Sequence, residues 1–146
     1  MLSKGQADVI KSIVDYINTN YKNTTIPKVL FDELSTSKDS ICITTAEDTT
    51  PSEKMADVCG GWLRGVVDIS LTYRKMLLDK GNKDLEVIKQ LDDIYDFIRK
   101  NYKSIETDDC FIEQVTQKSG AKLDVVYQGG VKDFKGIISI VYERRD

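Results

Sequence analysis

Histidine is absent from this 146-residue chain, and proline, cysteine and tryptophan are scarce, with two, three and one residues. Without histidine, the Ser-His and Cys-His nucleophile pairs and the usual zinc sites are excluded, because imidazole is the side chain that titrates near neutral pH. Carboxylate-dependent metal chemistry is the enzyme class that this composition leaves open. The composition therefore favours a protein that is not an enzyme, and we expect no cofactor.

The spacing of the cysteines, the net charge and the lack of long apolar runs exclude further classes of protein. Cys42, Cys59 and Cys110 are too widely spaced for a zinc ribbon or a redox pair, so we expect reduced thiols. A formal net charge of -3 gives no electrostatic argument for a nucleic-acid partner. No apolar run approaches the ~20 residues of a membrane span, and the first residues contain no signal-peptide core. We expect a soluble cytoplasmic protein with no membrane partner and no sequence-specific nucleic-acid partner.

Apolar residues recur at helical spacing in two segments, residues 4–21 and 84–102. Each segment has one apolar stripe, which is typical of a helix that packs one side against a core. Ser3 and Gln6 have the spacing of a capping box, in which each side chain binds the other residue's backbone N–H. The spacing predicts two amphipathic helices within a single domain over residues 1–146.

Alternating apolar and polar residues predict the strands. Pro27 places the first extended piece at a sheet edge, because proline cannot donate a ladder hydrogen bond. Gly120 and the pair Gly129 and Gly130 are expected to form turns in the last third of the chain. Two helices on one face of a mostly antiparallel sheet of about five strands, an α+β fold, is the simplest packing. The expected extended segments are residues 26–31, 39–45, 66–74, 111–115, 123–127 and 136–145.

Residues 45–64 form a polar stretch without a period, and loops of this length are usually functional or mobile. The stretch ends with a glycine pair, Trp62 and Arg64. The glycines match no nucleotide-binding motif and precede a strand, whereas a phosphate cradle would open a helix. Trp62 fits either the core or an interface, because Trp and Arg are enriched at binding hot spots. The candidate interface residues are Trp62, Arg64, Arg74 and Arg144.

The carboxylates do not form a metal-binding pattern. Asp92 and Asp93 are neighbours on the polar side of a predicted helix, and Asp108 and Asp109 precede a strand as turn residues do. The loop carboxylates lack the regular spacing and the glycine of a calcium loop; they are Glu47, Asp48, Glu53 and Asp57. We expect no metal site.

Nearly the whole chain resembles one protein family in the order of its expected helices and strands and in several sequence segments. The first helix is followed by "DSICITTAEDTTP", a loop, "GVVDISLTYRK", the helix "DLEVIKQLDDIYDFI" and the closing strand "FKGIISIVYERR". These hydrophobic patterns, in this order, resemble the tail terminator or minor capsid proteins of long-tailed bacteriophages and phage-derived tail particles (tailocins). The polar segment between Lys75 and Asp84 is longer than the family pattern, and it leaves a contractile or a noncontractile tail open.

The resemblance implies a structural protein that forms a homohexameric ring on the tail tube, stops polymerisation of the tube and offers the surface for head-tail joining. The implied partners are sister copies and the tail tube protein, with the tail sheath and head-neck proteins as further candidates. The implied location is a virion or a phage-like tail particle, assembled in the bacterial cytoplasm. The alternatives are a head completion or neck adaptor protein, a carboxylate-dependent metal hydrolase and a ligand-binding module of ferredoxin-like kind.

Overall fold

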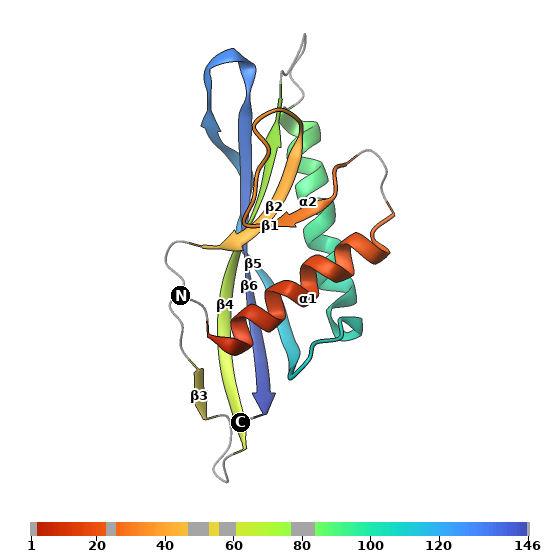
Figure 1. Ribbon diagram of the computed structural model, residues 1–146, viewed down its shortest axis with the longest axis vertical. Helices are drawn as coiled ribbons and strands as arrows, with labels where there is room; N and C mark the ends of the chain where they lie inside the picture. The colour runs from red at the N-terminus through yellow and green to blue at the C-terminus, as the bar shows by residue number, and fades with distance from the viewer. Residues whose placement is uncertain (1–2, 23–25, 47–52, 56–60, 77–83, 146) are drawn as a thin grey trace.

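A six-stranded sheet with two helices on one side forms the protein (Figure 1). The computed structural model describes residues 3–22, 26–46, 53–55, 61–76 and 84–145. In chain order the elements are α1 (Lys4–Asn20), β1 (Val29–Phe31), β2 (Ser40–Thr45), β3 (Glu53–Met55), β4 (Trp62–Lys75), α2 (Asp84–Asn101), the 3-10 turn η1 (Tyr102–Ser104), β5 (Cys110–Val126), the 3-10 turn η2 (Gln128–Gly130) and β6 (Lys132–Arg145). Neither helix of these described ranges has the length and apolar character of a membrane span.

The strand order is β1-β2-β4-β6-β5, and every neighbouring pair is antiparallel except β1 with β2. The 14 residues of β4 pair with β6 along one edge. On the other edge, β2 pairs with the second half of β4 and β3 pairs with its first residues. The α+β class with a mostly antiparallel sheet is therefore confirmed, with β3 as an additional short strand.

Both helices pack on the same sheet face and form a single core with it (Figure 1). The capping box at α1 is confirmed, because Ser3 Oγ accepts from the Gln6 backbone N–H at 3.2 Å and Gln6 Oε1 accepts from the Ser3 N–H at 3.0 Å. The alternation of β4 directs its odd-numbered residues into the core, as predicted. The largest fully buried side chains are Tyr73, Phe134 and Tyr142.

The last third of the chain forms two long strands, and the prediction of three short ones is wrong. Gly120 lies inside the 17-residue β5, which pairs with β6 along its length through four register shifts. Each shift is a bulge or irregularity that breaks the alternation, so the sequence pattern looks like two strands. The turn predicted at Gly129 and Gly130 is confirmed, and both residues have the positive φ that favours glycine, 83° and 86°.

The stretch predicted as a loop, residues 45–64, contains β3 and the first residues of β4. In β3, Glu53 pairs with Gly65 and the strand continues for two more residues. A three-residue strand has no measurable period, and its pairing depends on β4 extending beyond β2. The remainder of the predicted loop, residues 47–52 and 56–60, lies outside the described residues, as does the polar segment 77–83.

Candidate functional site

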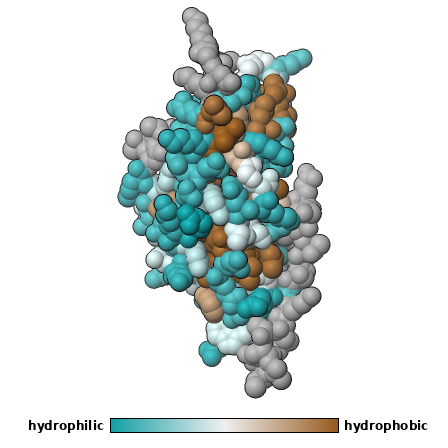
Figure 2. Space-filling model, turned by 180° about the vertical axis from the view of Figure 1, so that it is seen from behind, coloured by the Kyte–Doolittle hydropathy of each residue, from teal (hydrophilic) through white to brown (hydrophobic). Residues whose placement is uncertain are grey.

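The β5–β6 hairpin exposes apolar side chains at one end of the molecule (Figure 2). Eight large apolar side chains are exposed among the described residues, and four of them lie within the five residues 123–127. These are Leu123, Val125, Val126 and Tyr127, with exposed fractions between 37% and 60%. Contiguous exposed apolar surface of this kind marks interaction sites in soluble proteins. We call residues 122–132 the hairpin tip.

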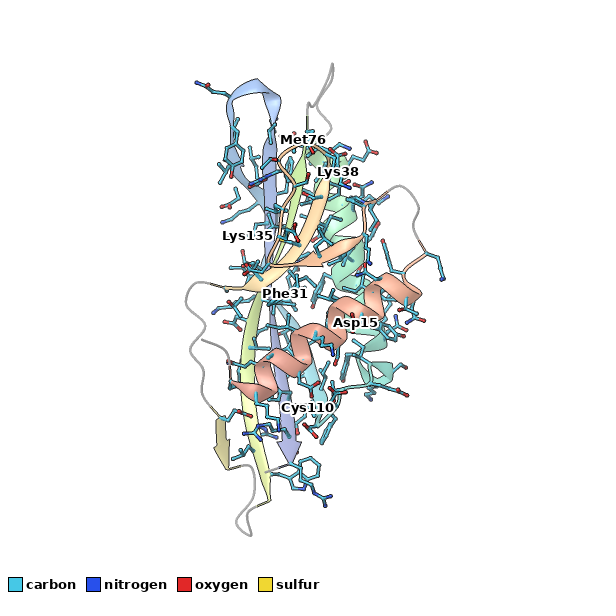
Figure 3. The ribbon with its side chains drawn as sticks, viewed as in Figure 1. Asp15, Phe31, Lys38, Met76, Cys110 and Lys135 are labelled. Atoms are coloured by element: carbon cyan, nitrogen blue, oxygen red, sulfur yellow. The ribbon has the colours of Figure 1, made fainter. Side chains whose placement is uncertain are left out.

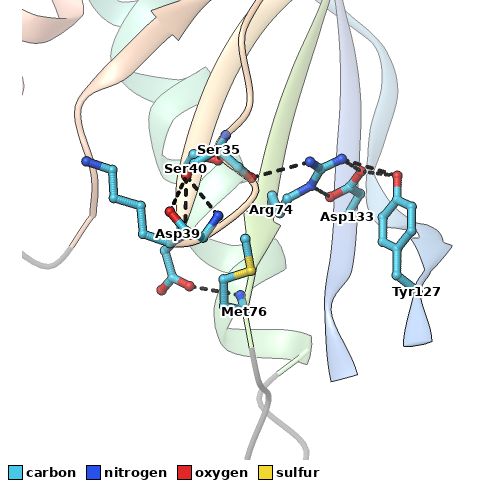
Figure 4. A network of polar contacts seen from close by, with 9 residues as sticks. Ser35, Asp39, Ser40, Arg74, Met76, Tyr127 and Asp133 are labelled. Carbon is cyan, nitrogen blue, oxygen red and sulfur yellow. Dashed lines mark hydrogen bonds and ion pairs between the residues drawn. The ribbon is translucent and has the colours of Figure 1, made fainter. Parts of the chain in front are cut away.

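Arg74 holds the hairpin tip to the body of the protein (Figure 4). Its Nε and Nη2 donate to both carboxylate oxygens of Asp133, at 2.8 and 3.0 Å. Tyr127 Oη donates to the same carboxylate at 2.9 Å, and the Tyr127 ring centroid lies 5.1 Å from the guanidinium carbon. The hydrogen bonds to Asp133 raise the pKa of Arg74. Arg74 is thus engaged within its own chain, where it positions the neighbouring hairpin tip.

Arg144 also makes its main contact within the chain. Its Nε donates to Glu53 Oε2 at 2.6 Å, and both side chains are mostly buried. This ion pair attaches β3 to the end of β6, on the far side of β4. In the alternation of β6, Arg144 is the next residue after Tyr142 on the core-facing side, but nothing in the sequence indicated Glu53 as its partner.

Tyr142 is completely buried, and its hydroxyl lies 3.2 Å from Ser3 Oγ. Burial raises the pKa of Tyr142 to about 12, against about 10 for an unfolded chain. The stabilising contribution of the neutral phenol is therefore complete below pH ~10 and is lost as the pH rises toward 12. We expect the urea midpoint of the wild type to fall between pH 9 and pH 11.5, and to fall less in Tyr142→Phe. Equal falls in both proteins would contradict a buried titrating phenol at this position.

Trp62 and Arg64 lie together on the sheet face that the helices leave open, at the start of β4. The Trp62 ring packs edge-on against Phe111 with centroids 5.8 Å apart, and the Arg145 guanidinium lies 5.8 Å from the indole centroid. Trp62 is half-buried and is not among the residues of the hydrophobic core. Val66 and Phe111 are 45% and 46% exposed. We call Trp62, Val66 and Phe111 the open-face patch.

Charged side chains border the open-face patch. Arg64 is 54% exposed and lies 3.0 Å from Glu113 and 3.3 Å from Glu143. The hydrogen bond with Glu113, together with the negative charge of that neighbour, raises the pKa of Glu143. An aromatic pair with arginines at its border has the composition of a binding hot spot. The interface role of Trp62 and Arg64 stays a prediction.

A third surface is a groove of about 380 Å³ between α1 and the edge strand β1. Its apolar lining consists of Ala7, Val14 and Phe31, and Phe31 is 49% exposed. Lys11 and Asp15 border the groove from α1, and Figure 3 shows Asp15 beside Phe31. The edge position predicted for the extended piece at residues 26–31 is confirmed for β1, which covers only Val29–Phe31 of that range. The sequence did not indicate the groove. The apolar stripe of α1 predicts which residues of this helix are buried, but it does not predict that Phe31 on the neighbouring strand is exposed.

The remaining candidate groups are engaged in the fold. Burial raises the pKa of the Cys42 thiol to about 11 and that of Cys110 to about 12. The backbone N–H groups of Asp108 and Asp109 both donate to the carboxylate of Asp8, which fits the turn predicted there. Within the described residues no three potential metal ligands gather at one place. Four residues considered above lie outside the described residues: Glu47, Asp48, Asp57 and Cys59.

The comparisons with known proteins add no relative: no protein-family model matches the chain, and no curated protein matches it. The three surfaces are the features of the described residues that bear on function. They lie at different parts of the molecule, and each combines exposed apolar side chains with charges at its border. Such surfaces suit contacts between proteins, because apolar area supplies affinity and bordering charges set orientation.

Proposed function

We propose that this protein is a structural subunit of a phage tail or a phage-derived tail particle. In this proposal it forms a closed ring at the end of the tail tube, stops tube polymerisation and offers the surface to which the head docks. One observation carries the proposal: seven of the eight exposed large apolar side chains among the described residues lie in three separate surfaces, the hairpin tip, the α1–β1 groove and the open-face patch, and Leu85 on α2 is the exception. The family resemblance in the sequence supplies the identity of the filament.

A ring subunit on a filament end requires three surfaces for the ring and the filament alone, before any surface for the head. In a closed ring of identical subunits, each copy contacts the next through two different patches. A terminator needs a third patch that binds the end of the filament. The open-face patch suits the third role, because Trp62 and Phe111 offer a large rigid apolar area beside Arg64. The hairpin tip and the groove are then left for the neighbouring subunits.

The proposal is tested in particles assembled without the protein. We expect tails of variable and excessive length that carry no heads, and restoration of uniform length when the protein is supplied. Tails of normal, uniform length without heads would favour the alternative, a head completion or neck adaptor protein. Normal tails with attached heads would overturn both assignments. Immunogold labelling in electron micrographs should place the protein at the head-proximal end of the tail.

Trp62→Ala is expected to weaken binding to the tube end while the subunit stays folded. Because Trp62 lies outside the core, we expect a melting temperature within a few degrees of the wild type. Loss of a hot-spot tryptophan costs about 2 kcal/mol or more, so binding to purified tubes should weaken by roughly 30-fold. Leu85→Ala is the matched control, since Leu85 is 75% exposed on α2 and belongs to none of the three surfaces. Unfolding of the isolated Trp62→Ala subunit would show that Trp62 stabilises the fold.

A further inference from the structure

We infer that the hairpin tip of one copy binds in the α1–β1 groove of the next copy. This inference rests on the proposed function and names the two faces that form the contact between subunits. The hairpin tip and the groove lie at separate parts of the same molecule (Figures 1 and 3). A contact between them therefore joins two different patches of two copies. Contacts of this head-to-tail kind form rings when the rotation between copies closes.

The two surfaces complement each other in shape and apolarity. The hairpin tip protrudes, and Val126 is 60% exposed near its end. The groove is recessed, with a volume of about 380 Å³ and an apolar lining of Ala7, Val14 and Phe31. Val126 of one copy against Phe31 of the next would remove apolar area from water on both sides, which is the main source of affinity in such contacts.

The charges that border the two surfaces are complementary as well. Lys11 and Asp15 are one helical turn apart on α1, which separates their Cβ atoms by about 5–6 Å. Lys122 and Asp124 are two residues apart on β5, a spacing of about 7 Å. One orientation of the hairpin therefore brings Asp124 to Lys11 and Lys122 to Asp15. The reverse orientation brings like charges together, so the charges select one orientation of the hairpin in the groove.

These charges are not committed to strong contacts in the free subunit. In the part of the chain that the structure describes, Lys11, Asp15 and Lys122 form no ion pair. Asp124 lies 4.0 Å from Lys135, the longest of the ion-pair distances there, and its side chain is 37% exposed. Surface pairs of this length contribute little to stability, so exchanging Lys135 for Lys11 of another copy costs little.

The hairpin is held in position before any partner binds. The Arg74–Asp133 pair and the hydroxyl of Tyr127 fix the base of the tip to β4. A protrusion that is already ordered loses less conformational entropy on binding, which favours affinity. The same network leaves Tyr127 41% exposed, so it is available to the contact.

The first test is the oligomeric state measured by sedimentation velocity up to about 1 mM, which detects dissociation constants in the millimolar range. We expect the wild type to self-associate, and Val126→Asp or Phe31→Asp to weaken self-association by at least 10-fold. Leu85→Asp, which places the same charge at an exposed apolar site on α2, should associate as the wild type does. A wild type that stays monomeric over this range would overturn the inference.

A mixture of two variants tests whether the contact is head-to-tail. Val126→Asp keeps an intact groove and Phe31→Asp keeps an intact hairpin tip, so each variant alone should be monomeric. Mixed in equal amounts, they should form a heterodimer that does not grow further, because one intact contact is possible and no second one is. A mixture that stays monomeric, or a variant that still forms rings alone, would show that the copies meet through other surfaces.

An exchange of charges tests the orientation of the hairpin tip in the groove, and it leaves the apolar side chains of both surfaces unchanged. Lys11→Glu with Asp15→Lys should weaken self-association by about 10-fold, and adding Lys122→Glu with Asp124→Lys should restore it. If association is unchanged by all these substitutions while Val126→Asp weakens binding to tubes, the tip binds the tube and the inference is wrong. If the contact is confirmed but particles lacking the protein have normal tails, the proposed function fails and the inference stands.

Discussion

Arg74→Ala is expected to lower the free energy of unfolding by about 3–5 kcal/mol, because it leaves the Asp133 carboxylate buried without its cation. Asp133 is 5% exposed, and the Tyr127 hydroxyl would be its one remaining side-chain donor among the described residues. For a chain of this length, the loss corresponds to a fall of roughly 10–15 °C in melting temperature. Urea unfolding followed by circular dichroism measures the change directly.

Two further variants separate charge from packing at this site. Arg74→Lys should recover only part of the loss, because an ammonium group cannot reproduce the bidentate contact of the guanidinium. Adding Asp133→Asn to Arg74→Ala should recover stability, since the neutral amide removes the unpaired charge. If Arg74→Ala alone leaves the urea midpoint unchanged, the buried ion pair contributes nothing to stability, and Arg74 would return as a candidate for an intermolecular contact.

Gly65→Ala is expected to destabilise the fold by about 3 kcal/mol, at the upper end of the range for overpacking. A Cβ atom at Gly65 would overlap the hydroxyl end of the Tyr142 ring. That ring has no room to move, because it is fully buried and a Cβ at Gly5 would meet it from another side. The melting temperature should fall by several degrees, and thermal unfolding monitored by circular dichroism checks this.

Gly120→Ala is the matched control for Gly65→Ala. Both glycines lie in strands, but an added Cβ at Gly120 meets no atom within 4 Å, and its φ is not in the left-handed region. We expect a neutral or slightly stabilising effect there, because alanine restricts the unfolded chain more than glycine does. Combining Gly65→Ala with Tyr142→Phe should recover part of the loss, since the hydroxyl oxygen is among the overlapping atoms. Equal stability of the two alanine variants would contradict the packing argument.

The elements with a strong local signal could be predicted from the sequence. Both helices follow from their apolar stripes, and the start of α1 follows from Ser3 and Gln6, because a capping box is a contact between residues three apart. The core-facing residues of β4 follow from strict alternation. Each of these signals depends on neighbours along the chain, so it can be recognised without the tertiary structure.

The features that the sequence did not reveal depend on distant residues. Arg74 and Arg144 looked like surface arginines, because their partners, Asp133 and Glu53, lie 59 and 91 positions away. The continuity of β5 depends on the partner strand β6, which accommodates its irregular register. The exposed tip could be predicted as a strand, but its exposure could not, because alternating apolar residues normally indicate a buried face.

The irregular register of β5 also has a consequence for solubility. β5 is the last strand of the sheet, and a long edge strand offers a template on which other chains can stack without limit. Four interruptions within 17 residues prevent a second strand from matching this edge continuously. Continuous backbone pairing of further copies along this edge is therefore disfavoured.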